Sequence, residues 1–256
     1  MTEITKYEPG MFSWVELATS DWNAARDYYC ALFGWTANPM PMGPPDVPPY
    51  VMLLKDGREV GALYENENIP PNWLSYVTVE SVDDTAKTAK DLGANLLQEP
   101  FDVMDVGRMA TMQDAQGARM ALWEPRAHIG ARVRDEVGTL CWNELMTSDA
   151  EAAQKFYQAL FNWNLKVTPG YTEVHVGERP AGGIMQIAPE MRGMPSHWQP
   201  YFLVDSADAT LARAQSLGTK EHFGPMDIPD VGRFAVLHDP QGASFAVIAM
   251  NPAHGM

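Results

Sequence analysis

The stretch Trp14-Val15-Glu16-Leu17-Ala18-Thr19-Ser20-Asp21 decides the fold, because the chain contains it twice. It returns as Trp142-Asn143-Glu144-Leu145-Met146-Thr147-Ser148-Asp149, an offset of 142 − 14 = 128 residues. Asp-x-Gln-Gly segments that begin at Asp114 and Asp239 repeat with an offset of 239 − 114 = 125 residues. Solenoid repeats have periods of roughly 20–50 residues, so a repeat of this length indicates a duplicated domain. We predict domain 1 at 8–125, a linker at 126–138 and domain 2 at 139–250.

The composition is that of a globular protein and excludes several kinds of partner. Of the 256 residues 46% are hydrophobic and 20% charged, and the formal net charge is −15. Such a charge repels nucleic-acid phosphates and anionic lipid surfaces, and no segment has the roughly 20 apolar residues of a membrane span. The first residues lack the pattern of a signal peptide, and Cys30 and Cys141 are not equivalent in the repeats. We therefore expect a cytoplasmic protein with reduced thiols, no nucleic-acid partner and no membrane partner.

Each repeat reads as two copies of one unit: a strand, a helix and about three further strands. Residues 12–18 alternate as a strand does, and helical spacing follows Ser20 and Ser148, which we predict as N-caps. Gly34 and Asn162 should end these helices, because both residue types tolerate the left-handed conformation. Strand and helix patterns start again at 74–80 and 82–92, and at 199–204 and 207–217. The four units predict an α+β fold built of two curled mixed sheets.

The repeated motifs resemble the vicinal oxygen chelate superfamily, which includes glyoxalase I, bleomycin-resistance proteins, methylmalonyl-CoA epimerase and extradiol dioxygenases. The resemblance covers nearly the whole chain and rests on the Tyr-x-x-Leu-Phe-x-Trp segments after each Thr-Ser-Asp and on the Asp-x-Gln-Gly turns. Segments such as Trp142–Leu145 and His128–Ala131 are similar to tandem, two-domain glyoxalase-like proteins, among them a mycobacterial antigen. The resemblance implies tandem βαβββ units and a pseudo-dimer within one chain, present as a monomer or as a homodimer. It does not choose a function, because one scaffold supports many activities.

The resemblance also implies where a divalent metal ion would bind. Family enzymes hold the ion with His, Gln or Glu at cavity-facing places on the first and last strands of the units. In this sequence those places are occupied by Trp14, Leu74, Ala121, Trp142, Gln199 and Ala246. Five of the six side chains have no donor for a metal, whereas a catalytic ion needs about three protein ligands. We therefore expect no metal at these places and no cofactor.

Strand alternation predicts what lines the two cavities instead. Val15 and Leu17 should face the helix, which leaves Trp14 and Glu16 on the opposite, concave side. The same phase selects the predicted ligand-binding residues, which are Trp14, Glu16, Tyr76, Arg119 and Trp123 in domain 1 and Trp142, Glu144, Gln199 and Tyr201 in domain 2. Aromatic walls around one carboxylate suit an apolar or cationic small molecule. In the alternative interpretation, each Glu pairs with Arg119 or with a Tyr hydroxyl inside a filled cavity and has no further role.

Three function classes remain open. The first is a small-molecule binding protein without the usual metal site. The second is a lyase, isomerase or dioxygenase that uses an unrecognised metal site, or Glu16 or Glu144 as a general base of raised pKa. The third is a structural or interaction protein with filled cavities. Separately, we predict that Arg108 and Arg233 form local salt bridges with Asp105 and Asp230.

Overall fold

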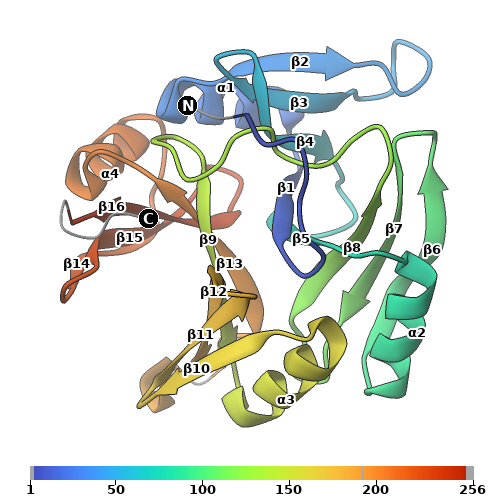
Figure 1. The fold of residues 1–256 in the computed structure, drawn as a ribbon. Helices are drawn as coiled ribbons and strands as arrows, with labels where there is room; N and C mark the ends of the chain where they lie inside the picture. The colour runs from blue at the N-terminus through green and yellow to red at the C-terminus, as the bar shows by residue number, and fades with distance from the viewer. Residues whose placement is uncertain (1–2, 192, 252–256) are drawn as a thin grey trace.

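The computed structural model describes residues 3–191 and 193–251, and it divides into four consecutive units (Figure 1). Domain 1 holds the first two units. Unit 1 contains β1 (Phe12–Thr19), α1 (Trp22–Phe33), β2 (Thr36–Met40), β3 (Tyr50–Lys55) and β4 (Arg58–Glu65). Unit 2 contains β5 (Asn72–Thr78), α2 (Val82–Asp91), β6 (Asn95–Val103), β7 (Gly107–Gln113) and β8 (Arg119–Pro125).

Domain 2 repeats this order. Unit 3 contains β9 (Leu140–Thr147), α3 (Ala150–Phe161), β10 (Asn164–Thr168), β11 (Tyr171–Val176) and β12 (Arg179–Gln186). A short 3₁₀ helix at Pro189–Met191 leads to unit 4, which contains β13 (His197–Leu203), α4 (Ala207–Ser216), β14 (His222–Ile228), β15 (Gly232–His238) and β16 (Ser244–Met250). The predicted α+β architecture of four βαβββ units is confirmed. No helix of the described residues is long and apolar enough to cross a membrane.

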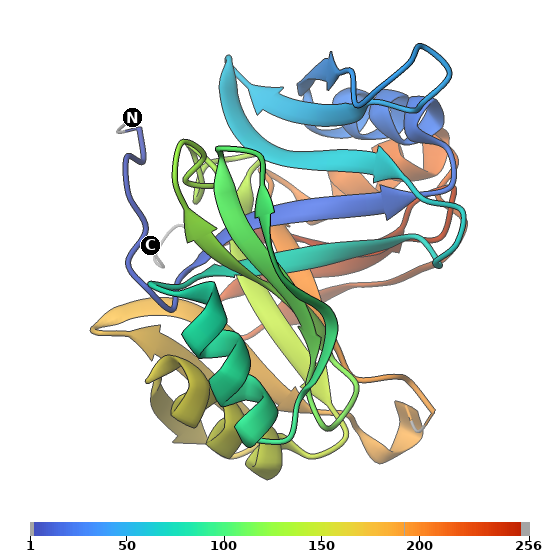
Figure 2. The ribbon, with the colours of Figure 1, turned by 90° about the vertical axis from the view of Figure 1, so that its right-hand side faces the viewer.

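Each domain forms one eight-stranded mixed sheet. The strand order is β2-β3-β4-β1-β5-β8-β7-β6 in domain 1 and β10-β11-β12-β9-β13-β16-β15-β14 in domain 2. The first strands of the two units pair antiparallel at the centre, and each also pairs in parallel with the last strand of its own unit. Both sheets curl, as Figure 2 shows for domain 1, and the helices cover the convex face. The concave face of each sheet is thus free of helices.

The helix boundaries follow the sequence closely, with one correction. The N-caps of α1 and α3 are Asp21 and Asp149, whose side chains accept hydrogen bonds from the amides of Ala24 and Ala152. The prediction of Ser20 and Ser148 was therefore one residue early. Gly34 and Asn162 end the helices with φ of 72° and 55°, so the predicted left-handed termini are confirmed.

The four edge strands β2, β6, β10 and β14 were not located in the sequence. They have one strand neighbour each, and most of their side chains are exposed, so they lack the alternation of a half-buried strand. Three of them contain a proline, at Pro39, Pro100 and Pro225. Proline is tolerated on edge strands, where no second ladder needs its missing N–H group.

The convex faces of the two domains pack against each other and build the main core. One hydrophobic cluster joins unit 1 with unit 4, and a second joins unit 2 with unit 3. Two pairs of buried hydroxyl and carboxylate groups cross this interface: Tyr29 donates to Asp239 (3.0 Å) and Tyr157 donates to Asp114 (2.9 Å). These repeat-kept residues therefore hold the two domains together.

Candidate functional site

Each concave face contains a glutamate held by tyrosine hydroxyls. In domain 1, the hydroxyl of Tyr50 donates to Glu16 Oε2 at 2.6 Å and that of Tyr76 donates to Oε1 at 3.0 Å. Glu16 lies on β1, opposite Leu74 of β5 and Ala62 of β4. Because Val15 and Leu17 belong to the cluster that α1 covers, the predicted orientation of Glu16 toward the concave face is confirmed.

Domain 2 repeats the arrangement with a further link. The Tyr201 hydroxyl donates to Glu144 Oε1 at 3.1 Å, and the nearby Tyr171 hydroxyl helps to lower the pKa of this carboxylate. The indole Nε1 of Trp142 donates to the Tyr171 hydroxyl at 3.1 Å. Gly183 is required here, because a Cβ at this position would overlap the Tyr171 hydroxyl oxygen. The Tyr171 hydroxyl therefore lies directly over Gly183, which is the strand neighbour of Glu144.

Burial dominates the electrostatics of both carboxylates. Desolvation raises the pKa of Glu16 and of Glu144 above the ordinary value, and the tyrosine hydrogen bonds oppose this rise. The pKa values of Tyr76 and Tyr201 also rise, because burial and the neighbouring glutamate both disfavour a phenolate. The tyrosines are therefore neutral donors, and each glutamate can gain a proton more readily than a solvent-exposed one.

Sequence reasoning missed Tyr50 and Tyr171. Their offset is 171 − 50 = 121 residues, whereas the glutamates repeat at 144 − 16 = 128. The difference of seven residues lies between β2 and β3, where the loop 41–49 has nine residues and its counterpart 169–170 has two. An alignment of the two repeats that allowed for this gap would have found the pair.

The predicted site residues of domain 1 share one face, but Arg119 lies at its exposed edge. Trp14, Tyr76 and Trp123 form a buried cluster. Arg119 is exposed at the start of β8, and among the described residues it forms no ion pair with Glu16. Of the two partners considered for the glutamate, Arg119 is wrong and the tyrosine hydroxyl is correct.

The linker covers the aromatic end of the domain 1 face. The His128 ring packs edge-on against Trp14 with 4.6 Å between ring centroids, and the His128 carbonyl accepts a hydrogen bond from Trp123 Nε1. Ala131 is buried in the same cluster, and its amide donates to the Ser13 carbonyl. In domain 1, the linker therefore covers the aromatic side chains Trp14 and Trp123.

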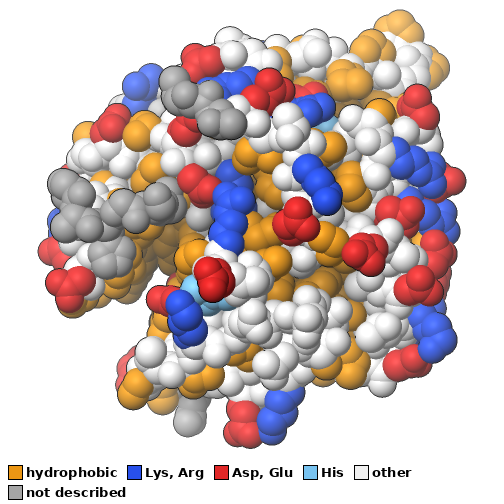
Figure 3. Space-filling view, viewed as in Figure 1, with side chains coloured by type: hydrophobic (Ala, Val, Ile, Leu, Met, Phe, Trp, Pro, Cys, Tyr) orange, Lys and Arg blue, Asp and Glu red, His pale blue; other side chains and the backbone are white. Residues whose placement is uncertain are grey.

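Among residues 3–191 and 193–251, no aromatic ring packs against Trp142 as His128 packs against Trp14. Trp142 is partly exposed, and the apolar residues around it are partly exposed too: Leu203, Ile228, Val231, Phe234, Val236 and Met250. Figure 3 shows a hollow between the β14–β16 region and the β10–β12 region, in which hydrophobic side chains gather. Two surface cavities lie elsewhere in domain 2: one of about 280 Å³ between α3 and strands β10–β12, and one of about 210 Å³ at the turn between β15 and β16. Neither of them is lined by Trp142, Glu144 or Tyr201.

The six positions predicted for a metal ion offer few donor atoms. Trp14, Leu74 and Ala121 lie on adjacent strands of the domain 1 face and offer no metal donor. On the domain 2 face, Gln199 is the only donor among the equivalent positions, and its Oε1 already accepts a hydrogen bond from Ser244 at 2.8 Å. Within residues 3–191 and 193–251, no three His, Cys, Asp or Glu residues are grouped to hold an ion.

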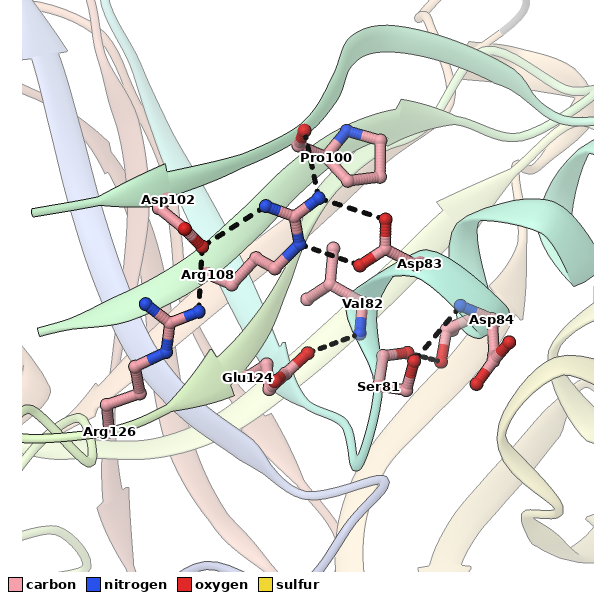
Figure 4. A network of polar contacts seen from close by, with 10 residues as sticks. Ser81, Val82, Asp83, Asp84, Pro100, Asp102, Arg108, Glu124 and Arg126 are labelled. Atoms are coloured by element: carbon pink, nitrogen blue, oxygen red, sulfur yellow. Dashed lines mark hydrogen bonds and ion pairs between the residues drawn. The ribbon is translucent and has the colours of Figure 1, made fainter. Parts of the chain in front are cut away.

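Arg108 and Arg233 lie away from the concave faces, and their ion-pair partners differ from those predicted. Arg108 binds Asp83 of α2 at 2.7 Å and Asp102 of β6 at 3.1 Å (Figure 4). Arg233 binds Asp208 of α4 and Asp227 of β14 in the same way. The prediction of Asp105 and Asp230 was wrong, since a fork-shaped guanidinium reaches across strands and to a helix N-terminus. Each arginine therefore links a helix, α2 or α4, to the hairpin that follows it.

Comparisons with known proteins place the chain in a family. The model of the Glyoxalase/Bleomycin resistance protein/Dioxygenase superfamily matches residues 12–122 and 135–247. The chain is 39% identical to "Putative glyoxylase CFP32" of Mycobacterium bovis over 98% of this chain and 99% of that protein. It is 31% identical to "Anthracycline biosynthesis protein DauV" of Streptomyces sp. strain C5, over 98% and 97%.

Solved structures agree with this fold. The Mn(II)-bound glyoxalase from Novosphingobium aromaticivorans superimposes with a TM-score of 0.66 at 11% identity, covering 94% of this chain and 82% of that one. The 2,3-dioxygenase LapB from Pseudomonas sp. KL28 gives 0.62 at 12% identity, covering 100% and 96%. The chain therefore belongs to the Glyoxalase/Bleomycin resistance protein/Dioxygenase superfamily.

Proposed function

We propose that the chain is a small-molecule binding protein without the family's usual metal site, and that the concave face of domain 2 holds the ligand. Its ligand is flat and apolar or cationic, it packs on Trp142 and Tyr201, and Glu144 is its polar anchor. Domain 1, whose aromatic residues are covered by the linker, serves mainly to complete the fold. We expect the protein to lie in the cytoplasm.

The observation that carries this proposal is the glutamate with two tyrosines beside an open apolar hollow. Aromatic walls with one convergent polar group are typical of pockets for flat organic molecules. The relative named for anthracycline biosynthesis is consistent with such a ligand, since anthracyclines are fused-ring aromatic compounds. The poor donor set at the metal positions argues against chemistry through a resident ion.

Replacing Glu144 should weaken ligand binding, whereas the same change at Glu16 should not. The probes are proflavine, a flat tricyclic cation, and phenanthridinone, a flat tricyclic lactam, both measured by fluorescence titration. Glu144→Gln should weaken binding by about 1–3 kcal/mol, roughly tenfold to a hundredfold, because a charged hydrogen bond is lost. Glu16→Gln is the matched control and should leave the affinity within twofold. Equal affinities in the wild type and both variants would sink the assignment.

Comparing the wild type with Glu144→Gln also tests whether burial raises the pKa of Glu144. Its pKa is higher folded than unfolded, so the folded state holds the proton more tightly, and this stabilisation disappears as pH rises through the folded pKa. The melting temperature of the wild type minus that of Glu144→Gln should therefore be greatest at acid pH and should decrease toward neutral pH. A difference that grows with pH would mean that hydrogen bonding, and not desolvation, dominates.

Metal analysis of the purified protein tests the other half of the proposal. We expect no stoichiometric Zn, Ni, Fe or Mn, and no change in proflavine or phenanthridinone affinity after treatment with a chelator. The reason is the donor set of the six positions, of which only Gln199 offers an oxygen. One equivalent of metal held by protein side chains in either concave face would refute this part.

The second candidate is an enzyme of lyase, isomerase or dioxygenase type. The observation in its favour is the raised pKa of Glu144, which suits a general acid or base near neutral pH. The glyoxylase name of the mycobacterial relative points the same way. Turnover of a bound probe that Glu144→Gln abolishes without loss of affinity would establish this alternative.

A further inference from the structure

A line of polar side chains crosses the concave face of domain 2 next to Trp142. Glu144 of β9 lies opposite Gln199 of β13, and Ser244 of β16 lies opposite His238 of β15. Ser244 Oγ donates to Gln199 Oε1, which joins the two pairs. These four residues, here called the polar row, span four neighbouring strands, or about 14 Å at the usual strand spacing.

The next line of side chains on the same face is apolar and aromatic. Trp142 lies opposite Tyr201, which lies beside Ala246, and Ala246 lies opposite Val236. A flat molecule placed across these strands would set one edge on the polar row and its ring face on the aromatic side chains. The surface therefore suits a ligand with one polar edge.

Among the described residues, two buried nitrogens of the polar row have no hydrogen-bond partner, Gln199 Nε2 and His238 Nδ1, and the one on the strand next to Glu144 is that of Gln199. Gln199 is only 4% exposed, and among the described residues its Nε2 has no hydrogen-bond partner. The hydrogen bond from Ser244 engages Oε1, so the unpaired group is the N–H₂ of a residue that lies opposite Glu144. An unpaired buried donor destabilises a protein, and native structures seldom keep one without a partner such as a ligand or water.

We propose that Gln199 Nε2 donates to a carbonyl-type oxygen of the ligand while Glu144 accepts from a neighbouring N–H or O–H of the same molecule. This inference rests on the proposed function and narrows its ligand class. The bound molecule is flat, mostly apolar and uncharged at this edge, and it carries a donor directly beside an acceptor, as a cyclic amide does.

Divergence between the repeats supports the assignment. On the domain 1 face, the place of Gln199 is taken by Leu74, which lies opposite Glu16. The places of Ser244 and His238 are taken by Arg119 and Gln113, which pair with each other in the same way. The glutamate and both tyrosines are kept, and the other two places stay polar, whereas the amide of Gln199 exists in domain 2 alone. A purely structural role would not need the extra amide in one copy.

The test compares three flat tricyclic probes that differ only at the edge. Phenanthridinone has an N–H beside a carbonyl, its N-methyl derivative keeps the carbonyl alone, and phenanthrene has neither group. Each is titrated against the full chain by quenching of tryptophan fluorescence, for the wild type, Gln199→Leu and Gln199→Glu. We expect the wild type to prefer phenanthridinone to phenanthrene, with the N-methyl lactam between them.

Gln199→Leu copies the residue of domain 1. It should weaken phenanthridinone binding about tenfold to a hundredfold and leave phenanthrene unchanged, because only the lactam uses the amide donor. Gln199→Glu, which replaces the donor by an acceptor, should also lose the preference. The melting temperature of Gln199→Leu should change little, since removal of an unpaired buried group offsets the loss of the acceptor of Ser244.

The failures of the inference and of the proposed function are distinguishable. Equal binding of all three probes by the wild type, or an equal loss for all three in Gln199→Leu, overturns the inference and leaves a binding site for flat molecules. A clear fall in the melting temperature of Gln199→Leu with unchanged probe preference also overturns it, because the amide would then be structural. Absence of binding by any probe overturns both.

Discussion

Replacing Asp239 by alanine is expected to lower the free energy of unfolding by about 3–5 kcal/mol. Asp239 Oδ1 accepts hydrogen bonds from the amides of Gln241 and Ala243, and Oδ2 accepts from the hydroxyl of Tyr29 in the other domain. The side chain is buried, so its loss leaves three donors without a partner, each at a cost of roughly 1–3 kcal/mol. Chemical denaturation of the full chain measures the effect.

Two further variants give the control and the interdomain part of this effect. Asp205→Ala changes an exposed aspartate that follows β13, and it should alter stability by less than about 0.5 kcal/mol. Tyr29→Phe removes the bond between domains together with the acceptor of Trp73 Nε1 (2.9 Å), and it should lower stability by about 1–3 kcal/mol. If Asp239→Ala were no more destabilising than Asp205→Ala, the pair of residues would not hold the domains together.

Gly130→Ala is expected to be the second most destabilising change, at about 2–5 kcal/mol. Gly130 has φ of 108°, and a Cβ there would lie 2.4 Å from the Ser13 carbonyl oxygen, which is backbone and cannot move aside. The left-handed conformation costs about 1–2 kcal/mol with a side chain, and overpacking adds about 1–3. The linker should then separate from β1, and the tryptophan fluorescence of Trp14 and Trp123 should shift to longer wavelength.

Gly93→Ala separates the two contributions. Gly93 follows α2 with φ of 96°, and nothing lies within 4 Å of the Cβ it would gain. It should therefore show the conformational cost alone, without a change in fluorescence. Equal losses for the two variants would mean that the close contact between Gly130 and Ser13 adds nothing.

The four βαβββ units could be predicted from the sequence because the same pattern of strand and helix periodicity occurs in it four times. Strand alternation correctly placed Val15 and Leu17 under the helix and Trp14 and Glu16 on the other face. Helix ends were accurate where a residue type has a specific backbone preference, as at Gly34 and Asn162. Edge strands were missed, since a strand with one neighbour and exposed side chains leaves little periodic signal.

The site was predicted only in part, because its remaining members depend on contacts between distant segments. Glu16, Glu144, Tyr76 and Tyr201 followed from alternation on the central strands. Tyr50 and Tyr171 follow loops of unequal length, so the repeat does not align them directly. The packing of His128 on Trp14 depends on the path of the linker. Arg119 was assigned by alternation to the correct face, but its place at the strand end leaves it exposed.

The crossed tyrosine–aspartate pairs have an evolutionary consequence. Tyr29 hydrogen-bonds Asp239, and Tyr157 hydrogen-bonds Asp114. A substitution on the convex face of one domain therefore removes a partner from a buried residue of the other domain. The concave faces take no part in this mutual constraint. After the duplication, one copy could therefore drift or acquire a new chemical preference while the other preserved the shared framework. Because both halves lie on one chain, the two copies are always inherited together.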